Sequence, residues 1–420
     1  MVKQHIFDSG LRLLVETKKN SKIISTGIMV NVGAVNENPE EYGLAHFVEH
    51  TLFKSTKNYN FKEISKKLEG LGIKYNASTS KQCTYFYMDC IKDSLNETYE
   101  LFADMFYNGI YDKEEIENER RVVLEEMNMC DDFSYDILLH NLMNNMYNGS
   151  IAGHRVIGDR SVIENATPET LKAFKEKYYT PNNMVVTIVG NITFDEALAL
   201  VEKHFNKDKN LKATFTPRLK IKVNPKIVKK YDSVQKDEKQ ITLAVLIKAP
   251  RVNEKEYDAL NVYSKILGGG RCSRLFDTLR EKEGLCYMVD SSTYSNTFIG
   301  ALMIFVSTSK ENVAHALTSV KTVLKDICNS VTEEELNRAK VSLKTDLIFA
   351  GEINHIMARS NASELYDFGK IISIEKESKK IDRVTLDDIN KIALKIASEK
   401  HFTVCAVGDS VPVEDLKNYS

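Results

Sequence analysis

The segment ISTGIMVNVGA (residues 24–34) alternates apolar residues with small or polar ones, which is typical of a half-buried β-strand. A similar segment, QITLAVLIKAP (240–250), follows 216 positions later. NMVVTIVGN (183–191) and HFTVCAVGD (401–409) repeat this relation at an offset of 218. Unrelated domains can also share strands that end in Gly and Asn or Asp. Because two independent offsets agree within two residues, we predict a duplicated domain.

In each half of the chain, strand patterns precede most of the helical patterns. The first half has strands near 11–16, 24–33, 73–80 and 83–91, and helices near 94–108, 113–130, 134–147 and 168–178. The second half has helices near 256–267, 273–282, 311–329 and 332–350. We therefore predict an α+β fold of two homologous domains, each a largely antiparallel sheet with helices packed on one face.

The segment that joins the two halves, residues 206–235, is rich in Lys and contains two of the seven prolines. This composition is typical of a linker that runs into an edge strand. The length of 420 residues fits two domains of about 200 residues each. We predict a first domain at 1–210, a linker at 211–235 and a second domain at 236–420.

Composition predicts a protein with no nucleic-acid or membrane partner. The 57 Lys and Arg residues nearly balance the 59 Asp and Glu residues, so the chain has no general attraction to polyanions. We find neither a signal-peptide pattern at the N-terminus nor a stretch approaching the roughly 18 apolar residues of a membrane span. The seven cysteines are scattered and contain no CxxC pair, which predicts reduced thiols in a cytoplasmic protein.

Two histidines and a glutamate lie within one helical turn in GLAHFVEHTLFKST (43–56). His46 and His50 are four residues apart, so both imidazoles project from one face of a helix. Two neutral imidazoles on one face suit zinc. Glu49 lies at the edge of that face, where a carboxylate can take a proton from a water molecule at the ion. The alternative is a helix whose polar face contains histidines by chance.

A catalytic zinc ion needs a third protein ligand and a fourth position open to water. The helical segment KEEIENERRVVLEEMNMC (113–130) offers Glu119 and Glu126, which are two turns apart and share a face with neighbouring valines. A glutamate on an apolar stripe is costly to bury unless it meets a cation. Glu125 points about 100° away and is the weaker candidate. Without a metal, such an acidic helix is usually a solvated surface.

The pentapeptide HFVEH (46–50), followed by ERRVVLEE (119–126), resembles the inverzincin metallopeptidases, the family of pitrilysin and insulin-degrading enzyme. The resemblance implies one zinc ion per chain, held by His46, His50 and Glu126. It implies that Glu49 is the catalytic base and that Glu119 orients the site.

The resemblance extends over most of the chain and implies substrate contacts. NASTSKQCTYFYMD (76–89) is similar to the family's strand beside the metal, where an extended peptide would pair by strand addition. The residues expected to pair are Asn76, Ala77, Ser78 and Thr79.

A second signature of the family is similar to LGGGRCSRLFDTLREKEGLCY (267–287), in which Arg280 and Tyr287 would contact the bound peptide. Outside that resemblance, Arg280 is typical of a surface charge and Tyr287 of a core aromatic residue. The resemblance assigns no role to His154, which we expect to be structural.

The second half lacks the metal motif, since Val262, Tyr263 and Ser264 stand 216 to 218 positions after His46. The resemblance implies a zinc endopeptidase for peptides or short unfolded segments, with one active and one inert domain. It implies a homodimer, or a heterodimer with an inactive sister subunit. One rival hypothesis is a non-catalytic binding or assembly subunit. Another is a structural zinc site, which would need four protein ligands.

Overall fold

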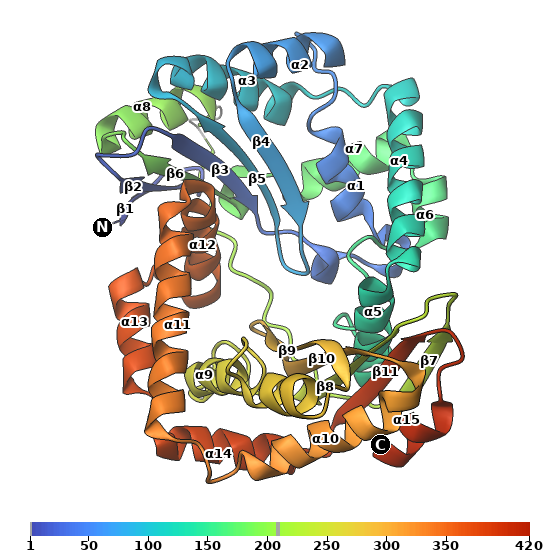
Figure 1. Cartoon of the computed structure of the whole chain (residues 1–420). Helices are drawn as coiled ribbons and strands as arrows, with labels where there is room; N and C mark the ends of the chain where they lie inside the picture. The colour runs from blue at the N-terminus through green and yellow to red at the C-terminus, as the bar shows by residue number, and fades with distance from the viewer. Residues whose placement is uncertain (1, 207–210) are drawn as a thin grey trace. The chain divides into compact units, whose positions relative to one another are not determined.

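The computed structural model describes residues 2–206 and 211–420, and the chain divides into two compact units (Figure 1). Unit 1 comprises the described parts of Met1–Asn128, Arg155–Leu219 and Phe349–Ser373. Unit 2 comprises Met129–His154, Lys220–Ile348 and Ile374–Ser420. The domain ranges expected from the sequence, 1–210 and 236–420 with a linker at 211–235, follow the chain, whereas each unit takes in a segment of the other half. Residues 207–210, at the end of the first expected range, lie outside the described residues.

Unit 1 is built on a six-stranded sheet in the order β1-β2-β6-β3-β5-β4. The β2–β6 pair is parallel and the other pairs are antiparallel. The strands are β1 (Val2–Ile6), β2 (Arg12–Thr17), β3 (Ile24–Val30), β4 (Lys74–Thr79), β5 (Thr84–Cys90) and β6 (Met184–Gly190).

Helices cover both faces of the unit 1 sheet. On one face, the Tyr99 hydroxyl of α3 lies 2.7 Å from Thr26 Oγ1 of β3. Met29 of β3 points to the opposite face, because successive strand residues alternate, and packs in a cluster with Leu365 and Tyr366 of α12. The helices of this unit include α1 (Leu44–Thr51), α2 (Phe61–Gly70), α3 (Leu95–Asn108), α6 (Arg160–Asn165), α7 (Pro168–Tyr178), α8 (Phe194–His204) and α12 (Asn354–Phe368).

Unit 2 is built on a five-stranded sheet in the order β7-β11-β8-β10-β9, with only β7 and β11 parallel among these pairs. The strands are β7 (Tyr231–Gln235), β8 (Ile241–Lys248), β9 (Cys286–Ser295), β10 (Gly300–Thr308) and β11 (Phe402–Gly408). This order and these directions match β2-β6-β3-β5-β4 of unit 1. The shared topology is what a duplicated domain predicts, and the predicted two-domain α+β class is confirmed.

The helices of unit 2 pack on its sheet as those of unit 1 do. Leu243, Val245 and Ile247 of β8 belong to one large apolar core that includes residues of α9, α10 and α14. Helix α5 packs against β8 and β11. The helices include α5 (Ser134–Tyr147), α9 (Tyr257–Leu267), α10 (Val313–Asp326), α13 (Ile374–Arg383), α14 (Leu386–Ala397) and α15 (Val413–Tyr419).

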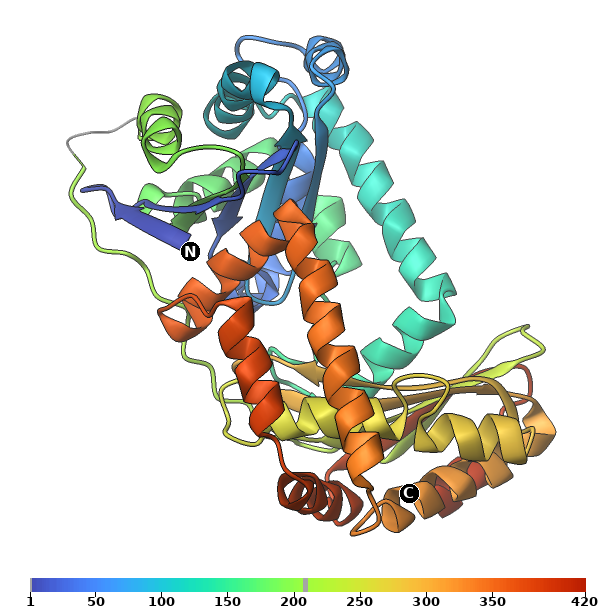
Figure 2. The same cartoon turned by 60° about the vertical axis from the view of Figure 1, so that its left-hand side comes forward.

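The two units exchange one helix each. Helix α4 (Lys113–Asp132) is followed by α5, which belongs to unit 2, and α11 (Glu333–Glu352) is followed by α12, which belongs to unit 1. Figure 2 shows α12, which is labelled in Figure 1, as the shorter of two neighbouring orange helices, beside the blue strands of unit 1. The sequence predicted helices on one face of each sheet, whereas the exchanged helices α12 and α5 cover the second face as well.

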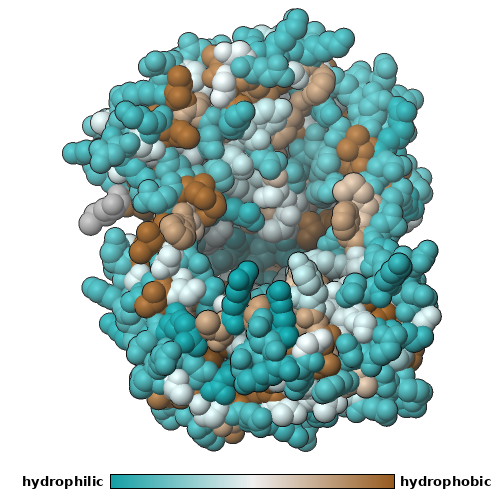
Figure 3. Space-filling model, in the orientation of Figure 1, coloured by the Kyte–Doolittle hydropathy of each residue, from teal (hydrophilic) through white to brown (hydrophobic). Residues whose placement is uncertain are grey.

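The surface drawn in Figure 3 is mostly hydrophilic, with hydrophobic residues scattered over it. Across residues 2–206 and 211–420, we find no helix with the length and apolar composition that crossing a bilayer requires.

Candidate metal centre

The helix that carries both histidines begins at a glycine that no other residue could replace without strain. Gly43 has φ = 100°, and a Cβ at this position would lie 2.7 Å from the carbonyl oxygen of Ile157. The buried carboxylate of Glu37 accepts hydrogen bonds from the backbone N–H groups of Gly43 (3.0 Å) and Ala45 (2.8 Å). Glu37 therefore caps the first turn of α1.

Three potential metal ligands converge between α1 and α4. His46 Nε2 and His50 Nε2 are 3.3 Å apart, and Glu126 Oε2 lies 3.6 Å from the first and 3.4 Å from the second. Zinc bonds to nitrogen and oxygen of about 2.0–2.1 Å place the corners of a tetrahedron about 3.4 Å apart. The donor set and its spacing therefore fit a zinc ion with one corner open to solvent. Within the described parts of the chain, this is the one cluster of three such residues.

Glu119 fixes the orientation of His50 from the side opposite the ligand atoms. Its Oε1 lies 2.8 Å from His50 Nδ1, and its other oxygen pairs with Lys54 Nζ. Glu119 is 6% exposed, so its charge is compensated by these two partners rather than by water. Burial raises the pKa of Glu119, but the bonds to His50 and Lys54 outweigh it and lower the pKa below its ordinary value.

The two histidines differ in protonation because their surroundings differ. Burial and the neighbouring His50 lower the pKa of His46 to about 4. Burial also acts to lower the pKa of His50, but Glu119 and Glu126 outweigh it and raise the pKa to about 9. His46 Nδ1 is buried and has no hydrogen-bond partner among the described residues. A neutral His46 is ready to donate a lone pair, whereas His50 must lose a proton to bind a cation.

Glu49 lies beside the cluster and is held by a threonine. Its Oε2 accepts a hydrogen bond of 2.6 Å from Thr79 Oγ1 at the end of β4. Burial raises the pKa of Glu49, and the bond from Thr79 partly opposes this shift. A half-buried carboxylate with a raised pKa is a typical general base, because it can both take and return a proton.

The expected substrate strand, from Asn76 to Thr79, forms most of β4 at an edge of the unit 1 sheet. Among the described residues β4 pairs with β5 on one side only, so its other edge is unpaired. Asn76 is exposed, and Ala77, Ser78 and Thr79 are half-buried. An unpaired strand edge is a template for an added strand.

Arg280 and Tyr287, both in unit 2, contact one another. The guanidinium of Arg280, in the π-helical turn Phe276–Lys282, lies 5.3 Å from the ring centroid of Tyr287 on β9. Tyr287 is 75% exposed, so it is not the core residue that its type alone would suggest. His154 lies in a turn that follows α5 in unit 2 and is not part of the metal cluster.

Three contacts of the site were not predicted from the sequence. Lys54 lies four residues after His50. This spacing could have indicated that an acid in contact with His50, here Glu119, would also pair with Lys54. Thr79 was expected only as a strand residue that pairs with substrate, and its bond to Glu49 has no signal in the sequence. Nor does a pattern point to Glu37 as the cap of α1.

Comparison with known proteins agrees with this geometry. The model of the insulinase family, peptidase family M16, matches residues 12–160, and that of the peptidase M16 inactive domain matches residues 165–343. The uncharacterized zinc protease YmxG of Bacillus subtilis is 28% identical over 96% of this chain and 97% of its own length. An uncharacterized zinc protease of Mycobacterium bovis is 32% identical over 93% of this chain and 90% of its own length.

Solved structures share the fold. The structure of a protease from Helicobacter pylori is 25% identical, has a TM-score of 0.87, and matches 97% of this chain and 99% of that chain. A structure titled peptidase M16 inactive domain, from Pseudomonas fluorescens, is 20% identical with a TM-score of 0.85 over 98% of both chains, which shows the fold alone. The family matches and the 32% identical relative together show that this chain belongs to peptidase family M16, the insulinase family.

Proposed function

We propose that this chain is a zinc-dependent endopeptidase that hydrolyses peptides or short unfolded protein segments. The observation that carries the proposal is the convergence of His46, His50 and Glu126 beside the half-buried carboxylate of Glu49. Ligands and a base in one place are what metal-assisted hydrolysis requires.

His46 Nε2, His50 Nε2 and the Glu126 carboxylate would hold one zinc ion. Bound there, zinc supplies Lewis acidity to the scissile carbonyl and lowers the pKa of water to about 7. Glu119 keeps the His50 proton on Nδ1, which leaves the Nε2 lone pair for the ion. This tautomer is also held by the charge of Glu119, which Lys54 balances.

Glu49 acts as the general base. It takes a proton from the attacking water and later gives it to the leaving amine, so that one carboxylate serves both half-steps. Thr79 holds the Oε2 of Glu49 at 2.6 Å, which restricts the carboxylate to one orientation. Because burial raises the pKa of Glu49, its protonated form is favoured and can donate the proton to the amine nitrogen as the C–N bond breaks.

The substrate would bind as an added strand on the free edge of β4, along Asn76, Ala77, Ser78 and Thr79. Backbone pairing accepts many sequences, which fits unfolded segments. Arg280 and Tyr287 would supply further peptide contacts. In this proposal residues 1–210 form the catalytic domain and residues 236–420 an inert copy, and two chains work as a homodimer or with a sister subunit.

The decisive experiment combines metal analysis of the purified chain with cleavage of a quenched-fluorescence peptide library. We expect one zinc ion per chain and cleavage that a chelator abolishes and that added zinc restores. Zinc without cleavage would favour a structural site, and neither zinc nor cleavage would favour a binding or assembly subunit. Manganese or cobalt in place of zinc would change the ion and leave the chemistry as proposed.

A further inference from the structure

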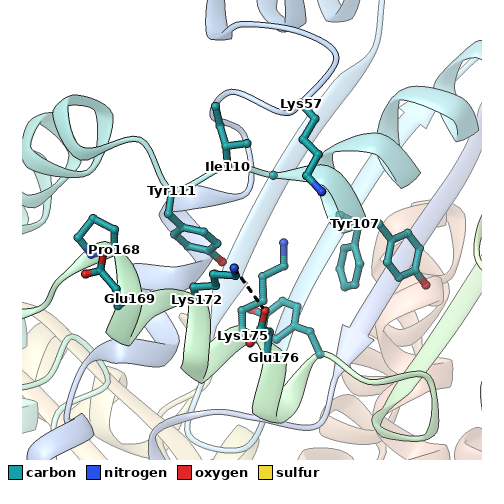
Figure 4. A pocket seen from close by; sticks show the side chains of 12 residues that line it. Lys57, Tyr107, Ile110, Tyr111, Pro168, Glu169, Lys172, Lys175 and Glu176 are labelled. Atoms are coloured by element: carbon teal, nitrogen blue, oxygen red, sulfur yellow. Dashed lines mark ion pairs between the residues drawn. The ribbon is translucent and has the colours of Figure 1, made fainter.

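A cavity of about 610 Å³ opens in unit 1, and no residue of the metal cluster lines it (Figure 4). Its walls are formed by α7, by the end of α3 with the residues that follow, and by Lys57. Cavities of this volume are typical of small-molecule sites. The proposed peptidase mechanism uses none of the residues that line it.

Lys175 places an uncompensated positive charge in this cavity. Its ammonium lies 5.8 Å from the ring centroid of Phe106 and 6.0 Å from that of Tyr111, and it makes no ion pair or hydrogen bond with the described residues. Burial lowers the pKa of Lys175 to about 8. A half-buried ammonium without an anion is costly, and an anionic ligand would offset that cost.

The other charges around the cavity leave a positive excess at one end. Lys57 is exposed, and its side chain reaches toward the same space as that of Lys175 in Figure 4. Lys172 pairs with Glu176 at 3.9 Å, a pair that is weak because both groups are exposed. Glu169 lies beside Pro168, away from Lys57. Lys57 and Lys175 therefore have no acidic partner among the described residues.

The remaining walls of the cavity are largely aromatic. Phe106, Tyr107, Tyr111 and Tyr179 all line the cavity. The hydroxyl of Tyr107 donates to the carbonyl of Phe205 at 2.9 Å, whereas the buried oxygens of Tyr111 and Tyr179 lie near the side chains of Thr51 and Thr84. Flat apolar walls favour a ligand with an aromatic or similar body.

We propose that this cavity binds a small organic anion, in which a carboxylate or phosphate group meets Lys175 and Lys57 and an apolar ring lies against the aromatic wall. Charge-assisted hydrogen bonds from the two ammonium groups fix the anionic end. No residue of the metal cluster lines the cavity, so a failure of anion binding and a failure of peptide cleavage are separate results.

Calorimetric titration of the full chain at pH 7 tests the proposal with four probes. The anions are 3-phenylpropionate and phenyl phosphate, which separate a carboxylate from a phosphate site, and the controls are the neutral 3-phenylpropionamide and phenethylamine. We expect at least one anion to bind about tenfold or more tightly than the amide, since a hydrogen bond to a charged group contributes about 1.5–3 kcal/mol. Phenethylamine should not bind.

Two variants and a matched control locate the site. Lys175→Met and Lys57→Met should each weaken anion binding about tenfold, whereas Lys66→Met, an exposed lysine on α2, should leave it unchanged. Lys175→Met removes an unpaired charge, so its melting temperature should equal or exceed that of the wild type, which shows that the variant folds. Equal binding by the wild type and both cavity variants, or no anion binding up to about 10 mM, would overturn the proposal.

Discussion

The sheets of units 1 and 2 have five strands in the same order. The corresponding helices of the two units, however, differ in their polar side chains. At the offset of 216, His46 and His50 of α1 correspond to Val262 and Ile266 of α9. Val262 is fully buried and Ile266 is 5% exposed. The apolar side chains fill the space in which unit 1 holds ligand nitrogens.

The acidic residues of the two units diverge in the same way. Glu49 corresponds to Lys265 at the offset of 216, and Glu126 of α4 corresponds to Asp346 of α11 at the offset of 220 between these helices. Lys265 Nζ and Asp346 Oδ2 form an ion pair at 3.0 Å. In unit 2 the acid therefore pairs with an ammonium group, whereas the corresponding acid of unit 1, Glu126, lies beside two imidazoles. This fold therefore tolerates both arrangements, and its chemistry depends on a few substitutions.

The largest effect should come from giving unit 1 the residues of unit 2. In His46→Val with His50→Ile, we expect zinc content to fall from one ion per chain to none and peptide cleavage to fall to background, because two of three ligands are lost. The fold should persist, since unit 2 accepts these side chains at the corresponding positions. Metal analysis and circular dichroism measure both. A variant that still binds one zinc ion would show that the ligands lie elsewhere.

The next effect separates the base from the ligands. Glu49→Gln should lower kcat by about 10³-fold while zinc content stays at one per chain, because the amide cannot take a proton. Glu125→Gln is the control, since Glu125 is an exposed neighbour on α4. Kinetics on a quenched peptide give kcat for both variants. Retained turnover in Glu49→Gln would exclude this residue as the base.

The Thr79 hydroxyl should have a smaller effect on turnover. Thr79→Val keeps the branched shape but loses the 2.6 Å bond to Glu49, so we expect kcat to fall about tenfold with KM nearly unchanged. Thr79→Ser should restore most of the activity. If Thr79 acts only as a strand contact for substrate, KM will rise instead and kcat will stay constant.

The positions of the elements followed closely from the sequence because they depend on local periodicity. Helices expected near 134–147 and 168–178 are found at Ser134–Tyr147 and Pro168–Tyr178. The exchange of α5 and α12 between the units could not be predicted, since an amphipathic pattern specifies an apolar face but not the sheet against which it packs. The same limit explains why the sequence suggested contiguous domains.

In the candidate site too, the features set by local spacing could be predicted, and those set by tertiary packing could not. The spacing of His46 and His50 follows from one helical turn, and the structure places Glu126 beside them. The sequence pattern put two valines on the ligand face of α4, but only Val123 is buried and Val122 is 51% exposed. The contacts of Glu49 with Thr79 and of Glu119 with Lys54 join segments whose approach is set by tertiary packing. Such contacts have no local signature.

The last prediction concerns stability, at the Glu37 carboxylate that caps α1. Burial raises the pKa of Glu37 to about 7 from an ordinary value of 4.5, against the opposing effect of the bonds from Ala45 and Gly43. Between pH 4.5 and about pH 7, Glu37 therefore keeps its proton in the folded chain but has lost it in the unfolded chain. The free energy of unfolding therefore falls as pH rises from about 4.5 to about 7.

Glu37→Gln removes this titration while its amide oxygen can still accept a backbone hydrogen bond. The free energy of unfolding of the wild type should fall relative to that of Glu37→Gln by about 3 kcal/mol across this pH range. Urea unfolding at pH 5 and pH 8 measures the difference, and Glu40→Gln, an exposed neighbour, should show none. The difference in free energy of unfolding between the wild type and Glu37→Gln could instead stay constant, or grow in favour of the wild type as pH rises. Either result would mean that Glu37 is ionised at both pH values. The cap would then be held by its charge, and the helix that carries His46 and His50 would be least stable in acid.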